Sequence, residues 1–167
     1  MIKLVTPFAA LRPEPEHAAA VIAPPYDVVS EQEARELAAG HPNSFLRISR
    51  PEIDLPPGTD PHSEAVYAKG AENLNRLTSL GLLTREATPS YYAYRMKMAE
   101  HEQTGIALTA SVAAYDANLV RKHERTRPDK ETDRVRNIDS LNAQTGPVLS
   151  VFRSDDTIKK ILEEVKL

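Results

Sequence analysis

Residues 60–81 read DPHSEAVYAKGAENLNRLTSLG, and their apolar side chains recur at the spacing of an α-helix. Asp60-Pro61 places proline at the first helical position, and Gly81 ends the pattern. The segment therefore predicts a helix with one face packed on a hydrophobic core. That face carries Val66, Tyr67, Gly70, Ala71, Leu74, Leu77 and Leu80.

Three further helices are predicted on either side of this segment. Ser30-Glu31-Gln32-Glu33 has the form of a capping box, and the helix that it starts should stop at Gly40. After Asp129, a narrow helical stripe runs up to Gly146-Pro147, with the members Val135, Ile138 and Leu141. The last helix is amphipathic, and its apolar face carries Ile158, Ile161, Leu162 and Val165.

The strands are predicted from alternation and from short apolar runs. Residues 90–98 alternate with period two, residues 100–104 turn the chain, and residues 105–112 return as the second strand of a hairpin. The run 148–152 is typical of a buried strand. We therefore predict an α+β fold, a mixed and mostly antiparallel sheet with helices packed on it in a sandwich-like arrangement, as a single domain over residues 1–167.

The composition excludes several classes of protein. Hydrophobic residues make up 41% and charged residues 27%, so disorder, collagen and coiled coil are excluded. The net charge of −3 argues against a generally basic nucleic-acid binder. Without cysteine there are no disulfides, thiolate chemistry or Cys-type zinc sites. The sequence has neither a membrane-length apolar run nor a signal-peptide pattern, so we expect a cytoplasmic protein with no membrane partner.

Motifs of common enzyme classes are missing. The chain has no P-loop, no dinucleotide-binding glycine fingerprint and no G-x-S-x-G nucleophile elbow. Its five histidines show no metal-binding spacing, so none of them is predicted as a metal ligand. His41 and His62 each stand beside a proline in a predicted loop, and we assign them no role.

Residues 121–136 form the densest charged cluster, with seven Lys or Arg and four Asp or Glu, a local net charge of 7 − 4 = +3. Guanidinium groups suit phosphate or carboxylate oxygens, and histidine moves protons near neutral pH. We predict phosphate or substrate binding by Lys122, Arg125, Arg127 and Arg134, and catalytic roles for His123 and Glu124. The alternative is a solvated surface whose opposite charges pair with each other.

Two smaller segments complete the candidate site. Polar side chains near the end of the following helix are predicted to hold a small ligand, namely Asn142, Gln144 and Thr145. In Ala23-Pro24-Pro25-Tyr26-Asp27, the prolines stiffen the approach to two functional side chains. Asp27 is a candidate general base or magnesium ligand, and Tyr26 is expected to close the pocket beside the charged cluster. The alternatives are a helix cap for the first group and an ordinary turn for the second.

These segments together resemble the bacterial domain-of-unknown-function 1015 family. The resemblance covers most of residues 1–153 and rests first on the opening segments PF (7–8), LRP (11–13), APPYDVV (23–29), NSFL (43–46) and RPEID (50–54). It rests further on the central segments KHERT (122–126), PDK (128–130), DR (133–134) and LNAQTGP (141–147).

The resemblance implies a distant relation to the ParB and sulfiredoxin-like group, which includes kinases of free serine. It implies a small-molecule phosphotransferase that acts on a serine-like hydroxyl and uses ATP or ADP with Mg²⁺. Longer family members carry a D-G-H-H-R motif after the matched region, so the chain is either an amino-terminal portion or a natural short form that lacks part of the site. In both cases we expect it to be inactive alone. The alternative is a non-catalytic module that binds a ligand or nucleic acid. The last helix suggests homo-oligomers.

Overall fold

A computed structural model describes residues 2–123 and 125–165. Contacts within the chain define two compact units, each of which is described by itself. The first comprises Met1–Ala10, Glu86–Arg125 and Gly146–Leu167, and the second comprises Leu11–Arg85 and Thr126–Thr145. The prediction of a single domain can be checked by a single cooperative unfolding transition.

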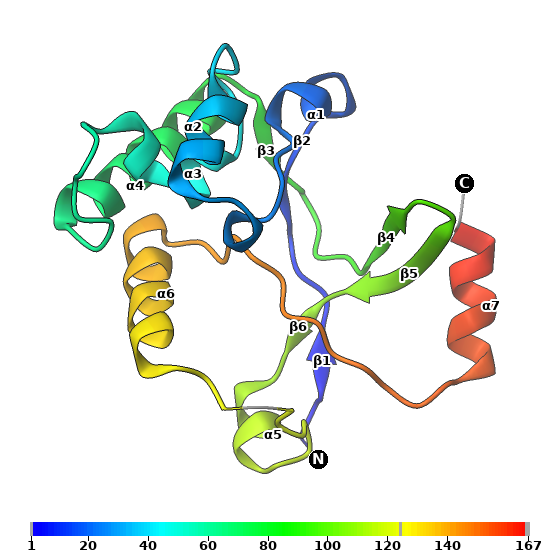
Figure 1. The fold of residues 1–167 in the computed structure, drawn as a ribbon. Coiled ribbons are helices and arrows are strands. Elements are labelled where there is room, and N and C mark those ends of the chain that lie inside the picture. Colours follow the sequence, from blue (N-terminus) through cyan, green and yellow to red (C-terminus); the bar gives the residue numbers. More distant parts are fainter. Residues whose placement is uncertain (1, 124, 166–167) are drawn as a thin grey trace. The chain divides into compact units, whose positions relative to one another are not determined.

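The second unit contains most of the helices (Figure 1). Its elements are β2 (Leu11–Pro13), α1 (Pro15–Val21), η1 (Tyr26–Val28), α2 (Glu31–Ala38), α3 (Leu46–Ser49), η2 (Pro51–Asp54), α4 (Glu64–Ser79), β3 (Leu83–Arg85) and α6 (Pro128–Leu141). The strands β2 and β3 pair antiparallel, with Arg12 opposite Thr84. α4 packs against α3, η2 and α6, so it lies at the centre of this unit.

The apolar face of α4 forms the core as the sequence predicts. One cluster of buried side chains comprises Val21, Ile48, Leu74, Leu77, Leu83 and Leu141. A smaller cluster under α2 comprises Ala34, Ala38, Leu46 and Ile53. Leu80, at the end of the predicted stripe, is exposed, because the helix ends at Ser79 and Gly81 turns the chain with a positive φ of 71°.

Gly70 allows a close approach of Pro51 and Ile48 to α4 in this core. A methyl group added there would lie 2.9 Å from Cγ of buried Pro51 and 3.4 Å from the carbonyl oxygen of Ile48. We expect Gly70→Ala to lower the free energy of unfolding by about 1–2 kcal/mol in urea unfolding, because overpacking outweighs the helix propensity of alanine. Gly105→Ala is the control, since its added methyl group would meet nothing within 4 Å. Equal stability of Gly70→Ala and the wild type would contradict this packing argument.

The first unit contains β1 (Val5–Thr6), β4 (Tyr92–Met98), β5 (His101–Ala107), β6 (Thr109–Ala110), α5 (Val112–Asp116) and α7 (Asp156–Val165). β1 pairs with β6, and β4 pairs with β5, both antiparallel. The hairpin is confirmed, but β5 begins at His101 rather than at residue 105. A tight turn at Ala99, whose φ is 50°, replaces the longer turn predicted over 100–104.

The α+β class is confirmed, and every strand pair in the described residues is antiparallel. The strands form three two-stranded sheets instead of one mixed sheet. The buried strand predicted at 148–152 is wrong: Val148 and Val151 are 84% and 89% exposed, and the segment pairs with no described strand. None of the described helices has both the length and the apolar character needed to cross a bilayer.

Candidate functional site

A carboxylate on α6 is the centre of a polar cluster in the second unit. Asp133 Oδ1 accepts a hydrogen bond of 2.8 Å from the Tyr67 hydroxyl and lies 3.1 Å from His62 Nδ1. The Tyr67 side chain comes from α4, and His62 comes from the turn before it. The Asp133 side chain is 13% exposed and that of His62 is 55% exposed, so a half-buried acid contacts a histidine that solvent reaches.

The turn that carries His62 follows from the sequence before α4. Asp60 Oδ1 accepts a hydrogen bond of 2.9 Å from the His62 N–H, and Asp60 O accepts one of 3.0 Å from the Ser63 N–H. This aspartate turn delays the helix, which starts at Glu64 rather than at Pro61 as predicted. The delay leaves His62 outside the helix and facing the side chain of Asp133.

One face of α6 and this turn line an open hollow of about 350 Å³. The residues that line it are His62, Tyr67, Pro128, Asp129, Thr132, Asp133 and Arg136. The α6 members at 129, 132, 133 and 136 follow the i, i+3, i+4, i+7 spacing of one helix face. Pro128 at the first helical position starts this face.

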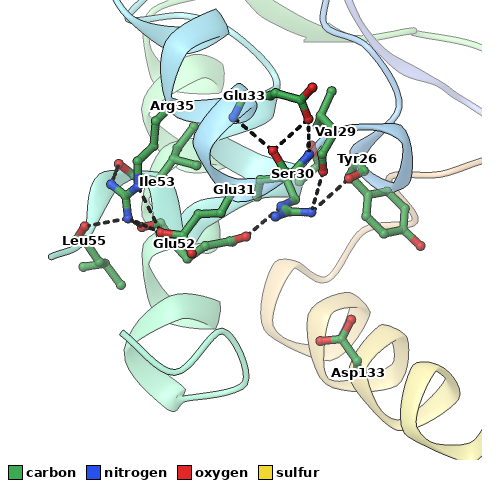
Figure 2. A network of polar contacts seen from close by, with 12 residues as sticks. Tyr26, Val29, Ser30, Glu31, Glu33, Arg35, Glu52, Ile53, Leu55 and Asp133 are labelled. Atoms are coloured by element: carbon green, nitrogen blue, oxygen red, sulfur yellow. Dashed lines mark hydrogen bonds and ion pairs between the residues drawn. The ribbon is translucent and has the colours of Figure 1, made fainter. Parts of the chain in front are cut away.

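Arg134 holds the second oxygen of the Asp133 carboxylate. Its Nη2 and Nε donate to Asp133 Oδ2 at 2.5 and 3.1 Å, and its guanidinium carbon lies 4.3 Å from the centre of the Tyr26 ring. The stacking joins η1 to α6, and Figure 2 shows the Tyr26 ring directed toward the helix that carries Asp133. The predicted approach of Tyr26 to the charged segment is therefore present for Arg134.

A polar network behind Tyr26 fixes the backbone of this turn (Figure 2). Arg50 Nη1 donates to the carbonyl oxygens of Tyr26 and Val29, both at 3.1 Å. Arg50 Nε also donates to Glu52 Oε1 at 2.7 Å, and Glu52 is 6% exposed. Arg35 in turn donates to the Glu52 carbonyl oxygen at 2.8 Å. These contacts hold η1, and hence the Tyr26 ring, against the rest of the unit.

The surroundings shift two pKa values in opposite directions. Burial by itself would raise the pKa of Asp133, but hydrogen bonds from Arg134 and Tyr67 outweigh it and hold the pKa below its ordinary value. Burial and the hydrogen bond to Asp133 raise the pKa of Tyr67 to about 12. At neutral pH the cluster therefore contains an ionised carboxylate and a protonated phenol.

Arg136 lies next to His62 at the edge of the hollow. Its Nη1 donates to the His62 carbonyl oxygen at 2.8 Å, and its Nη2 donates to Glu64 Oε1 at 2.6 Å. Its guanidinium carbon lies 4.5 Å from the centre of the Tyr67 ring. The hollow thus has a cation at its edge and the Asp133–His62 pair in its wall.

The predicted site residues divide between the two units. Tyr26, Asp27, Arg127, Arg134, Asn142, Gln144 and Thr145 belong to the second unit, and Lys122, His123 and Arg125 belong to the first. The structure brings together Tyr26 and Arg134. Lys122 Nζ lies 4.4 Å from the centre of the Tyr115 ring, and the side chains of His123 and Arg125 are exposed. Glu124 lies outside the described residues.

Most of the remaining predicted residues of the second unit lie at the surface. Asp27 on η1 is exposed. Arg127 donates to both oxygens of Asp129, at 3.3 and 2.8 Å. Asn142 caps α6 in the left-handed conformation, with φ of 47°, which matches the cap alternative for this segment. Gln144 is exposed and Thr145 is half-buried.

Sequence reasoning missed four members of the cluster as site residues, namely His62, Tyr67, Asp133 and Arg136. Tyr67 was predicted as part of the core stripe, and it is 3% exposed. In the sequence His62 stands beside Pro61, and its partner Asp133 lies 71 residues further along the chain. No local motif joins residues at this separation, so no spacing in the sequence indicates the pair.

The donor atoms at the hollow do not suit Mg²⁺, which the resemblance implies for the reaction. No group of three or more His, Asp or Glu side chains in residues 2–123 and 125–165 could hold a metal ion. Both Asp133 oxygens already accept hydrogen bonds, from Tyr67 and from Arg134. Mg²⁺ prefers several oxygen ligands, so the side chains that line this hollow do not fit the ion.

The comparisons with known proteins find one family. The family described as "Protein of unknown function (DUF1015)" matches residues 5–167, which is nearly the whole chain. No curated protein and no solved structure matches the chain.

Proposed function

This chain belongs to the DUF1015 family of proteins of unknown function, and we propose that it is a phosphotransferase acting on the hydroxyl group of a small, serine-like molecule. The observation that carries the proposal is the contact of 3.1 Å between His62 Nδ1 and the half-buried carboxylate of Asp133. The relation to the ParB and sulfiredoxin-like group is part of the same proposal and rests on the sequence segments quoted above.

The Asp133–His62 pair has the properties of a general base. Because the pKa of Asp133 is lowered, its carboxylate is ionised at neutral pH and accepts a hydrogen bond from Nδ1–H of the His62 ring. The Nε2 atom is then the proton acceptor of a ring that lines the hollow. A carboxylate that holds the tautomer and orientation of a histidine in this way is a recurring arrangement in enzymes.

Such a base fits transfer of a phosphoryl group to a hydroxyl. The substrate oxygen would attack the terminal phosphorus of ATP or ADP while His62 Nε2 takes the hydroxyl proton. A new P–O bond forms, and the bond to the departing ADP or AMP breaks. The reaction depends mainly on positioning and on cations that balance the spread negative charge, and Arg136 offers such a cation beside the base.

The base and Arg136 both lie within this chain, so the proposal expects activity from the chain itself, unlike the expectation from the resemblance that it is inactive alone. The test is to incubate the protein with L-serine and ATP or ADP and to measure phosphoserine by mass spectrometry. We expect His62→Gln to lower the turnover number by about 100-fold or more, because a general base contributes about 10²–10⁴-fold. His41→Gln, an exposed histidine of the same unit, is the matched control and should leave turnover unchanged. Absence of phosphoserine with either nucleotide, or equal turnover of both variants, would overturn the proposal.

A further inference from the structure

We infer that the outer edge of the Arg136 guanidinium is a binding subsite for the phosphate or carboxylate group of a small ligand, and that Glu64 occupies this edge until the ligand displaces it. The inference deepens the proposed function and rests on it for the reaction that the bound ligand would undergo. Binding itself requires only the contacts around Arg136.

The guanidinium of Arg136 is held in place before any ligand binds. The His62 carbonyl oxygen accepts from Nη1 at 2.8 Å, and the Tyr67 ring lies under the guanidinium at 4.5 Å. Tyr67 is itself 3% exposed and hydrogen-bonded to Asp133, so this support is rigid. An arginine fixed on two sides loses little rotamer freedom when it binds an anion.

The third contact of Arg136 is the one that can be exchanged. Nη2 donates to Glu64 Oε1 at 2.6 Å, but the Glu64 side chain is 91% exposed and that of Arg136 is 38% exposed. Ion pairs this exposed contribute little, so a ligand anion can replace the Glu64 carboxylate at small cost. The carboxylate of Glu64 is itself an oxyanion, so its contact with Nη2 shows that this edge of the guanidinium can bind one.

The other carboxylates at the hollow do not compete for Arg136. Asp133 is bound by Arg134 and Tyr67, and Asp129 receives two hydrogen bonds from Arg127. Each is therefore balanced by its own guanidinium. Glu64 is the carboxylate that pairs with Arg136.

The geometry limits the ligand to a small molecule with an oxyanion. A guanidinium edge matches two oxygens of a phosphate or carboxylate group. The hollow of about 350 Å³ is at the small end of ligand pockets. Because Arg136 donates to the backbone of His62, an anion held there would lie next to the imidazole that lines the same hollow.

Binding is measured by NMR titration of the folded protein with two probes, inorganic phosphate and L-serine, without nucleotide. We expect at least one probe to bind, and the identity of that probe distinguishes a phosphate subsite from a carboxylate subsite. Arg136→Gln should weaken its binding at least tenfold. Glu64→Gln should strengthen it by about threefold, since the internal competitor is removed.

Glu72→Gln is the matched control. Glu72 pairs with Lys69 at 2.6 Å on the same helix, and eight residues separate it from Glu64, about 12 Å along the axis. The substitution removes the same charge from α4 but should leave the affinity for the probe unchanged. Equal strengthening by Glu64→Gln and Glu72→Gln would show a general charge effect and overturn the inference.

The inference would also be overturned if neither probe bound, or if the wild type and Glu64→Gln bound the probe with equal affinity. The comparison of Glu64→Gln with the wild type remains decisive if Arg136→Gln does not fold.

His62→Gln separates this inference from the proposed function. The Arg136 contact is to the His62 backbone, so His62→Gln should still bind the probe while losing turnover. Probe binding without phosphoserine formation in the wild type would remove the phosphotransferase and leave the anion subsite.

Discussion

Asp133→Ala is expected to lower the free energy of unfolding by about 2–4 kcal/mol. The substitution removes the acceptor of the buried Tyr67 hydroxyl and leaves the Arg134 guanidinium, which is 31% exposed, without its carboxylate. A buried donor that loses its acceptor costs about 1–3 kcal/mol, and breaking a partly buried ion pair adds to this. Urea unfolding followed by circular dichroism measures the change.

Asp129→Ala is the control for this substitution. Asp129 is on the same helix, lines the same hollow and pairs with Arg127, but its side chain is 59% exposed. We expect the stability of this variant to stay close to that of the wild type, because solvent screens the pair. Similar losses in Asp129→Ala and Asp133→Ala would mean that the Asp133 cluster contributes no more than a surface ion pair.

The elements predicted correctly are those whose signals are local. The capping box of α2 is present as expected: the Glu33 carboxylate accepts from the Ser30 N–H at 2.7 Å, and Ser30 Oγ accepts from the Glu33 N–H at 3.3 Å. The 16 residues of α4 bury their predicted face because helical periodicity is contained within the segment. Propensity and capping act between residues a few positions apart, so sequence alone indicates them.

The run 148–152 shows where this reasoning fails. Apolar, β-branched residues are typical of a buried strand, but a strand also needs a partner with which to pair. Pairing depends on segments distant in the sequence, and Phe152 is 62% exposed without one. The same limit explains why one sheet was predicted where the structure has three pairs of strands. Alternation within 90–98 indicates that the segment is a strand, but it does not indicate which strand lies beside it.

The candidate site was predictable only in part for the same reason. The sequence indicates Arg134 because guanidinium groups suit oxyanions, and it indicates Tyr26 because two prolines stiffen the segment before it. In the structure the Arg134 guanidinium stacks on the Tyr26 ring at 4.3 Å. The contact of His62 with Asp133 requires the aspartate turn before α4 and the packing of α6 on α4 at once. Neither can be deduced from residue spacing, so the residues that carry the proposed function became apparent only in three dimensions.

Alkaline pH is expected to destabilise the protein specifically through Tyr67. The pKa of Tyr67 is raised to about 12 in the folded chain, whereas an unfolded tyrosine titrates near 10. A group with a raised pKa stabilises the fold fully below the unfolded value, and this contribution is lost as pH rises from about 10 through 12. The loss amounts to about 1.4 kcal/mol at pH 11.

Tyr67→Phe isolates this effect, because phenylalanine has no proton to lose. At pH 7 the variant should be less stable than the wild type by about 1 kcal/mol, owing to the lost hydrogen bond to Asp133. By pH 11 the difference should vanish or reverse, since only the wild type loses the contribution of the buried hydroxyl. Urea unfolding at pH 7, 10, 10.5 and 11 measures both chains, with Tyr94→Phe on exposed β4 as the control. A constant difference between Tyr67→Phe and the wild type across these pH values would show that the Tyr67 hydroxyl does not titrate as a buried donor to Asp133.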